Sequence, residues 1–162
     1  MNMGQSMLAI GAMILLSIVV LRVNNSFLST NSVMMESKFG VLATSLAQSM
    51  VEEASKKAFD EKTSGVALFD VTLLTGPGSL GPEGESYLNF DDFDDYNGYT
   101  RDVTNLPSAI YHISCSVNYI SPLSPDIISS NRTWNKKITV TVTSPSSPDT
   151  VKLSSIFSYW SF

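Results

Sequence analysis

Few residues in the sequence belong to the types that perform nucleophilic catalysis, bind transition metals or form disulfides. The 162 residues include one cysteine, Cys115, and one histidine, His112. A lone cysteine excludes an intrachain disulfide, and any catalytic triad would have to depend on His112. Glycine-rich phosphate loops, zinc-ligand spacings and dinucleotide-binding fingerprints are absent as well. We therefore expect a protein that is not an enzyme.

Basic residues are scarce too. Lysine and arginine number 10 against 15 aspartates and glutamates, which gives a net charge of −5. Residues 59–162 hold 12 of the acids and 6 of the bases, so the C-terminal part carries the negative charge. Because nucleic-acid binding needs a basic patch that displaces counterions, no nucleic-acid partner is predicted.

A long apolar run stands near the N-terminus. Residues 7–21 read MLAIGAMILLSIVVL and are apolar apart from Ser17. With the residues just before it, the run approaches the roughly 17 to 20 residues that cross a bilayer as a helix. A secretory signal peptide would have basic residues before the run and a small-residue cleavage site after it, and the sequence has neither. The run therefore indicates a membrane anchor or a helix with a structural role.

Proline is missing from residues 22–62, and Gly40 is the only glycine there. Apolar residues recur in this segment at spacings of three or four, which is the pattern of a helix face packed on a core. The residues predicted to pack on a sheet are Met35, Phe39, Leu42, Leu46, Met50 and Ala54. The pattern predicts one helix over about residues 5–60, with a stop near Gly65, because glycine suits a C-cap.

One segment of the predicted helix is rich in side chains that compete for backbone hydrogen bonds. These residues are Asn24, Asn25, Ser26, Ser29, Thr30, Asn31 and Ser32. Short polar side chains bind neighbouring backbone groups and thereby weaken a helix. We expect a bend, fraying or melting near residues 23–33.

The remaining residues predict an outer β domain. The apolar run at 66–75 is a candidate short strand, and a polar stretch follows it to Pro107. Regular alternation of apolar and polar residues predicts further strands at 110–120, 136–143 and 151–160, the last two joined by the turn sequence SPSSPD. Such an antiparallel sheet has one apolar face, which the helix stripe would cover. The predicted class is α+β, with one long N-terminal helix packed on a C-terminal antiparallel sheet.

Residues 42–61, LATSLAQSMVEEASKKAFDE, and the terminal hairpin at 136–160 resemble segments of minor type IV pilins. The whole layout is similar to the type IV pilins and the related type II secretion pseudopilins, in which a short leader precedes an apolar helix start, one long helix and an antiparallel sheet. The resemblance covers nearly the entire chain.

The resemblance implies a pilin-like function. The chain would be a structural subunit of an extracellular filament at the cell surface, held in the membrane before assembly. Its partners would be copies of itself in a helical filament, other pilin-like subunits, an inner-membrane assembly machinery and a prepilin peptidase. The peptidase would cut after Gly4 and leave Gln5 as the new N-terminus. The residues that would form the filament core are Met7, Leu8, Ile10, Met13, Leu15, Leu16, Ile18, Val19 and Leu21.

The sequence departs from the family pattern in two ways. Residues 1–4 contain no lysine or arginine, whereas family leaders usually do. Ala9 is the fifth residue after the implied cut, where major pilins carry a glutamate, and no acid precedes Glu36. These departures fit a minor or tip subunit, or a filament whose packing is purely apolar.

The predicted organisation has four parts. They are a possible leader at 1–4, an apolar membrane or filament-core helix at 5–22, an amphipathic continuation of the helix at 23–62, and an outer β domain at 63–162 with an acidic loop at 79–107.

The acidic loop contains the sequence FDDFDDYNG. Clustered carboxylates, an amide oxygen and a glycine turn suit calcium, and some pseudopilins are similar in holding calcium near their sheet. The candidate ligands are Asp92, Asp94, Asp95 and Asn97. The alternative interpretation is a solvated surface loop without an ion.

Two functions therefore compete at this point. In the first, the chain polymerises into a filament through its apolar helix. In the second, the chain is a permanently membrane-anchored binding module, and its acidic β ectodomain engages a partner.

Overall fold

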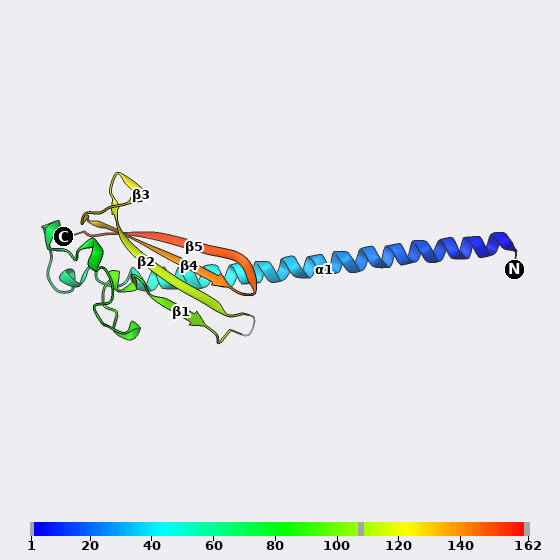
Figure 1. Ribbon diagram of the computed structural model, residues 1–162, viewed down its shortest axis with the longest axis horizontal. Coiled ribbons are helices and arrows are strands. Elements are labelled where there is room, and N and C mark those ends of the chain that lie inside the picture. The colour runs from blue at the N-terminus through cyan, green and yellow to red at the C-terminus, as the bar shows by residue number, and fades with distance from the viewer. Residues whose placement is uncertain (1, 107–108, 161–162) are drawn as a thin grey trace. The chain divides into compact units, whose positions relative to one another are not determined.

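The computed structural model describes residues 2–106 and 109–160. A single long helix, α1 (Met3–Ala54), precedes an antiparallel sheet of five strands (Figure 1). The predicted α+β class is confirmed. The chain divides into two compact units, Met1–Lys38 and Phe39–Phe162.

The first unit consists of the N-terminal part of α1, and this part is α-helical without interruption from Met3 onward. The predicted interruption at residues 23–33 is therefore wrong. Two hydroxyls of that segment bind the helix's own carbonyl groups: Thr30 Oγ1 donates to Ser26 O at 2.9 Å, and Ser32 Oγ donates to Leu28 O at 3.2 Å. Because these hydroxyls bond four residues back along the helix, they do not displace its backbone hydrogen bonds.

The second unit begins with the last turns of α1, which pack on the sheet. The buried residues of this helix face are Phe39, Ala43, Ala47, Met50, Val51 and Ala54. Leu42 and Leu46, also predicted for this face, are partly buried beside it. Met35 belongs to the first unit and is exposed. Alanines at the centre of the face leave room for a close approach of the helix to the strands.

The helix ends earlier than predicted, at Ala54 rather than near residue 60. After a turn, Ala58 forms a bridge with the acidic loop: Ala58 N donates to Asp91 O at 3.1 Å, and Phe93 N donates to Ala58 O at 2.9 Å. Phe59 and Asp60 are then buried. The backbone groups of Ala58 thus form hydrogen bonds with the acidic loop instead of continuing the helix. Gly65, eleven residues after the end of α1, is therefore not its C-cap.

Four strands form the continuous sheet in the order β1-β2-β4-β5, and β3 pairs with β2. Their bounds are β1 Thr100–Val103, β2 Tyr111–Ser121, β3 Ser124–Ile128, β4 Asn135–Ser144 and β5 Ser147–Ser158. The strands β2, β4 and β5 confirm the three predicted alternating segments. The tight connection from β4 to β5 confirms the predicted hairpin, with a shorter turn than expected.

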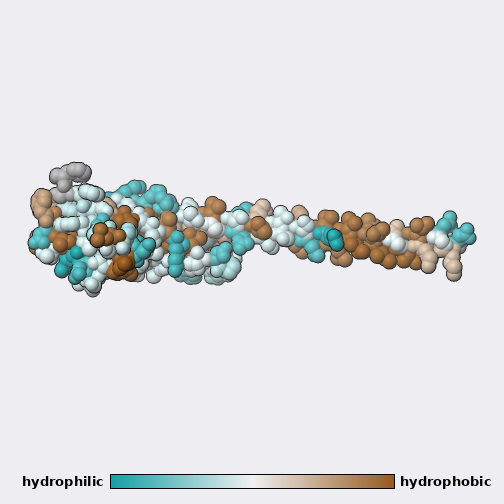
Figure 2. All heavy atoms as spheres, turned by 90° about the horizontal axis from the view of Figure 1, so that it is seen from above, coloured by the Kyte–Doolittle hydropathy of each residue, from teal (hydrophilic) through white to brown (hydrophobic). Residues whose placement is uncertain are grey.

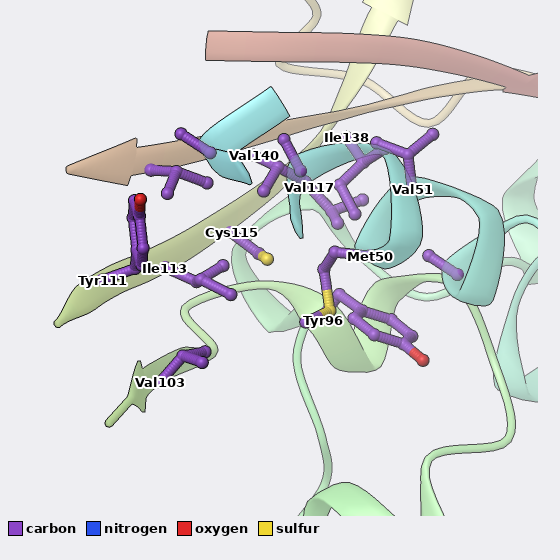
Figure 3. Packing of buried hydrophobic residues seen from close by; sticks show 14 of the residues in the cluster. Met50, Val51, Tyr96, Val103, Tyr111, Ile113, Cys115, Val117, Ile138 and Val140 are labelled. Atoms are coloured by element: carbon purple, nitrogen blue, oxygen red, sulfur yellow. The ribbon is translucent and has the colours of Figure 1, made fainter. Parts of the chain in front are cut away.

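The two central strands show why alternation predicted them well. Buried residues alternate with exposed or partly exposed ones along most of β2, and with partly exposed ones along β4. Cys115 and Val117 of β2 lie near Met50 and Val51 of α1, as the close view of the core shows (Figure 3). The sheet thus buries one face against the helix, and Cys115 is a small apolar filler of that core.

The apolar run at 66–75 is not a strand, which corrects the prediction. It contains the short 3-10 helix η2 (Val71–Leu73), whose N-cap Asp70 accepts hydrogen bonds from Thr72 N at 2.9 Å and Thr72 Oγ1 at 2.7 Å. These hydrogen bonds within the segment form a local turn, so the segment does not pair with a strand. The short strands β1 and β3 were not predicted, because neither carries regular alternation.

Candidate functional site

The first candidate site is the apolar surface of the first unit. Every residue predicted for the filament core is exposed in this chain, with exposed fractions from 77% at Leu8 to 46% at Ile18. These residues are Met7, Leu8, Ile10, Met13, Leu15, Leu16, Ile18, Val19 and Leu21. Figure 2 shows the corresponding stretch of α1 covered by apolar side chains. Within the part of the chain that the structure describes, α1 alone is long and apolar enough to cross a membrane.

Gly4 and Gln5, the predicted processing residues, lie in the first turn of α1. Both are exposed. A Cβ placed on Gly4 would meet no atom within 4 Å. The backbone N–H of Gln5, on the C-terminal side of this peptide bond, donates to Asn2 O at 2.8 Å.

The second candidate site is the aspartate run of the acidic loop, which is largely buried rather than solvated. Asp92, Asp94 and Asp95 are each no more than 1% exposed. Asp92 Oδ1 accepts hydrogen bonds from the backbone N–H groups of Asp94 (2.7 Å) and Asp95 (3.1 Å). Asp95 Oδ2 in turn accepts from the backbone N–H groups of Asp91 (2.9 Å) and Asp92 (3.0 Å). These carboxylates hold the loop in shape by binding its backbone donors.

Asn97, the fourth predicted calcium ligand, joins the loop to the sheet. Its Nδ2 donates to Leu80 O at 2.9 Å, and its Oδ1 accepts from Val117 N at 3.0 Å. The amide oxygen is therefore engaged by β2. Asp92 Oδ2 and Asp94 Oδ2, by contrast, are buried and have no hydrogen-bond partner among the described residues.

Lys136 lies at the centre of this buried acidic region. Its side chain is fully buried, and Nζ donates to Asp60 Oδ2 at 2.8 Å and to Phe59 O at 2.8 Å. The same nitrogen contacts Asp94 Oδ1. The Nζ atom lies 4.6 Å from the ring centre of Phe59 and 5.3 Å from that of Tyr119. One lysine thus joins the segment that follows α1, the acidic loop and the sheet in a fully buried cluster.

The two aspartates bound to Lys136 have different acidities. Burial alone would raise the pKa of Asp60, but the charge and hydrogen bond of Lys136, with further hydrogen bonds from Lys62 and Thr75, hold it below its usual value. Burial raises the pKa of Asp94 in spite of the attraction of Lys136. The difference has a structural reason, since Asp60 accepts from several donors whereas Asp94 Oδ2 has none.

Further carboxylates surround the loop at the surface. The ligand atoms of Glu61, Asp91 and Asp92 lie within 4.8 Å of one another, as do those of Glu85, Asp91 and Asp95. Burial and the charges of neighbouring acids raise the pKa of Glu83 to about 7. Two of the predicted ligands, Asp92 and Asp95, therefore belong to different carboxylate groups. Calcium binding stays a prediction.

Sequence reasoning missed Asp60 and Lys136 as members of this region, although a signal for Lys136 was present. Lys136 stands two residues before Ile138 in β4 and shares the strand face of Ile138, Val140 and Val142, all of which are buried. Strand alternation alone thus places a lysine in the core. Asp60 carries no comparable signal, because its burial depends on where the helix ends.

The lone cysteine and histidine do not form a catalytic pair. Cys115 is buried, and burial together with the charge of Glu53 raises the pKa of its thiol to about 12. His112 is half exposed on the opposite face of β2, where Nδ1 lies 2.5 Å from Asp102 Oδ1. An un-ionised thiol is a poor nucleophile. Because His112 lies on the other face of the strand, it cannot act as a base for Cys115 in this arrangement.

A pocket of about 400 Å³ lies where residues 68–69, the start of β4 and the end of β5 come together. Its lining includes Phe69, Trp134, Tyr159 and Trp160, and the rings of Trp134 and Tyr159 stack with centres 5.2 Å apart. Phe69 and Trp160 are largely exposed. The pocket therefore presents aromatic surface to solvent.

Fold and surface together define an α+β protein whose N-terminal helix carries a membrane-compatible apolar surface. Comparison with protein-family models, curated proteins and solved structures finds no match to this chain.

Proposed function

We propose that the chain is a non-enzymatic, structural subunit of a type IV pilus-like extracellular filament that polymerises through the apolar part of α1. The observation that carries the proposal is the exposure of apolar side chains on all sides of the helix from Met7 to Leu21. A helix that packs only on its own small domain has a single apolar stripe, as the part of α1 at residues 39–54 has. A helix that is apolar all round is buried in lipid or among other helices.

In this proposal, contact with neighbouring helices replaces contact with lipid, so the hydrophobic effect keeps the extracted subunit in the filament rather than in water but does not itself drive extraction from the bilayer. Burial of apolar surface contributes about 25 cal/mol per Å², so roughly 1,000 Å² buried per subunit would supply on the order of 25 kcal/mol before ordering costs are subtracted. No acid lies in the apolar part of α1, so in this proposal subunits contact one another through apolar packing rather than through a buried charge pair. This favours a minor or tip subunit, or a filament held by apolar contacts alone.

The proposal includes a route to the surface. The subunit is stored in the inner membrane through α1, a prepilin peptidase cuts between Gly4 and Gln5, and an assembly machinery extracts the subunit into a filament with other pilin-like chains. The exposed position of Gly4 in the first turn of α1 supports access by a peptidase. The test is the N-terminal residue of the chain in filaments sheared from cells, which we expect to be Gln5.

The central experiment replaces Leu15 or Ile18 with glutamate. Both side chains are exposed in the isolated subunit, so the change does not disturb the outer domain but places a charge in the proposed filament core. We expect filaments to disappear from electron micrographs of the sheared fraction. Ile127→Glu, at an exposed position of β3, is the matched control and should assemble normally.

Parallel measurement of the chain in the membrane fraction separates failed assembly from failed insertion, because a charge at the centre of a spanning helix costs about 2.5 to 3.5 kcal/mol. Normal filaments from Leu15→Glu and Ile18→Glu subunits would contradict the proposal.

The second candidate function is a permanently membrane-anchored binding module. The exposed aromatic pocket that contains Phe69, Trp134 and Trp160 favours it, because exposed aromatic surface is typical of recognition sites. In that case the chain would keep Met1, stay in the membrane fraction and be missing from sheared material. The N-terminal experiment therefore distinguishes the two functions.

A further inference from the structure

We propose that Lys136 and Asp94 form an intramolecular amide bond, between Nζ of the lysine and Cγ of the aspartate, with Asp60 as the group that transfers the proton. The bond would lock the acidic loop to the central strand of the sheet. It does not depend on the filament proposal, because all three residues belong to the second unit.

The amine of Lys136 already lies against the carboxyl group that it would attack. Lys136 Nζ contacts Asp94 Oδ1, and Oδ1 is bonded to the carbon that the amine would attack. Lys136 sits in β4, paired with Tyr119 of β2 on one side and with Phe157 of β5 on the other. Its backbone is therefore fixed by two neighbouring strands. Well-oriented groups of this kind reach effective concentrations of about 10⁵ to 10⁸ M, which allows reactions that are negligible between free molecules.

Asp94 is held as firmly as Lys136. It begins the 3-10 helix η5 (Asp94–Tyr96), and its backbone N–H donates to Asp92 Oδ1 at 2.7 Å. The preceding residue, Phe93, is fully buried and donates its N–H to Ala58 O at 2.9 Å. The loop therefore cannot carry the carboxyl group away from the lysine without breaking buried contacts.

The surroundings exclude water, which is both the product of the condensation and the reagent for its reversal. Lys136, Asp60 and Asp94 have fully buried side chains. The rings of Phe59 and Tyr119 flank the Nζ atom. A dry site makes separated charges costly, and the condensation replaces an ammonium and a carboxylate by one neutral amide. The burial that makes the ion pair expensive thus favours the linked product.

The atoms balance without any further reagent. One Nζ proton passes to the carboxylate of Asp94 and is carried on Oδ2, which gives a neutral amine and a neutral carboxyl group. The amine lone pair then forms the N–Cγ bond. Asp60 Oδ2, 2.8 Å from Nζ, takes a second proton and returns it to the departing oxygen, which leaves as water when its bond to Cγ breaks. The third proton stays on the amide nitrogen, and no electron is gained or lost.

The hydrogen-bond pattern indicates which oxygen leaves. Asp94 Oδ2 is buried and has no partner among the described residues. Its departure therefore breaks no hydrogen bond. The amide N–H of the product keeps a partner in Asp60 Oδ2 or Phe59 O, both of which accept from Nζ before the reaction.

The decisive measurement is the mass of the purified full-length chain under denaturing conditions. We expect a mass lower by one water molecule than the mass calculated from the observed N-terminus. Protease digestion and tandem mass spectrometry should find one peptide that joins the segment around Asp94 to the segment around Lys136. An unaltered mass in folded, purified protein would overturn the proposal.

Variants assign the bond to its residues. Lys136→Arg and Asp94→Ala should have their full calculated masses, whereas Lys137→Arg, a change at the neighbouring lysine of β4, should still lose one water. Asp60→Asn, which cannot take a proton, should leave the chain mostly unlinked. Loss of water by Lys136→Arg would show that the modification lies elsewhere and would overturn the assignment. Full linkage in Asp60→Asn would overturn the role given to Asp60.

Discussion

Asp92 is a buried aspartate whose surroundings favour the protonated form of its carboxyl group. It is fully buried, and its Oδ2 atom has no hydrogen-bond partner among the described residues. Burial raises the pKa of Asp92 to about 8, and the negative charges of Asp94 and Asp95 add to the shift. The carboxyl group is therefore neutral over most of the physiological range, which removes one negative charge from a region that already holds several.

This shift predicts that the outer domain is more stable in mild acid. An aspartate has a pKa of about 3.9 in an unfolded chain, so between that value and about 8 the folded chain holds more protons at Asp92 than the unfolded chain does. Stability then falls as the pH rises through this window and is greatest at its acid end. We expect the free energy of unfolding to rise by on the order of 2 kcal/mol between about pH 8 and about pH 5. Denaturant unfolding at a series of pH values measures it.

Asp92→Asn is the matched variant, because an amide keeps the Oδ1 acceptor and cannot ionise. Its stability should depend less on pH, and at alkaline pH it should be at least as stable as the parent chain. A weaker slope should remain, since the pKa of Glu83 is also raised. Asp60 acts in the opposite direction only at more acid pH, where protonation of its low-pKa carboxyl group weakens the contact with Lys136. An equal slope in parent and variant would contradict the assignment to Asp92.

At the scale of elements, the contact between α1 and the sheet depends on small side chains. Ala47 is fully buried in the middle of the helix face. A larger side chain there would push the helix away from β2 and β4 or force neighbouring side chains out of their preferred rotamers. We expect Ala47→Leu to destabilise the second unit by about 1 to 3 kcal/mol, as overpacking does in other cores. Thermal or denaturant unfolding of the full chain in detergent is the measurement.

Ser49→Leu adds a leucine to the same helix two residues away, at an exposed position. It should leave the stability within about 0.5 kcal/mol of the parent value. If both variants unfold like the parent chain, the helix does not pack closely on the sheet at Ala47.

The elements that could be predicted from sequence are those whose pattern is local. The alternation of β2 and β4 repeats over several residues and predicted the buried face of each strand. The stripe predicted on the helix includes Phe39, Met50 and Ala54 of the buried face but misses its small residues Ala43 and Ala47 and the neighbouring Val51. The end of α1 could not be placed in this way, because it is set by pairing of Ala58 with Asp91 and Phe93, more than thirty residues away. The strands β1 and β3 likewise owe their pairing to β2 and have little pattern of their own.

The buried acidic region was half visible in the sequence. The run of aspartates was recognised and interpreted as a calcium site or a solvated loop, and the second alternative assumed carboxylates that point outward. The structure buries three of them because Lys136, from a distant strand, reaches the same pocket. A charged residue within a strand is expected to be buried when it lies on the same strand face as the apolar residues, and Lys136 lies on such a face.

At the scale of the whole molecule, the two units use their apolar residues differently. Both hydrophobic core clusters consist of residues from Phe39 onward. The apolar residues of the first unit are exposed and take no part in either cluster. Folding of the outer domain therefore needs the last four turns of α1, whereas the preceding apolar segment is left for lipid or for other chains.

This division predicts the behaviour of a chain that lacks residues 1–38. The shortened chain keeps every residue of both core clusters, so we expect it to fold, to dissolve without detergent and to unfold cooperatively at nearly the same denaturant concentration as the outer domain of the full chain. It should also sediment as a monomer and fail to enter filaments, because it has lost the apolar surface. Circular dichroism and analytical ultracentrifugation provide the two measurements. A shortened chain that does not fold would show that the first unit stabilises the second, and one that still assembles would exclude the apolar part of α1 as the element that drives polymerisation.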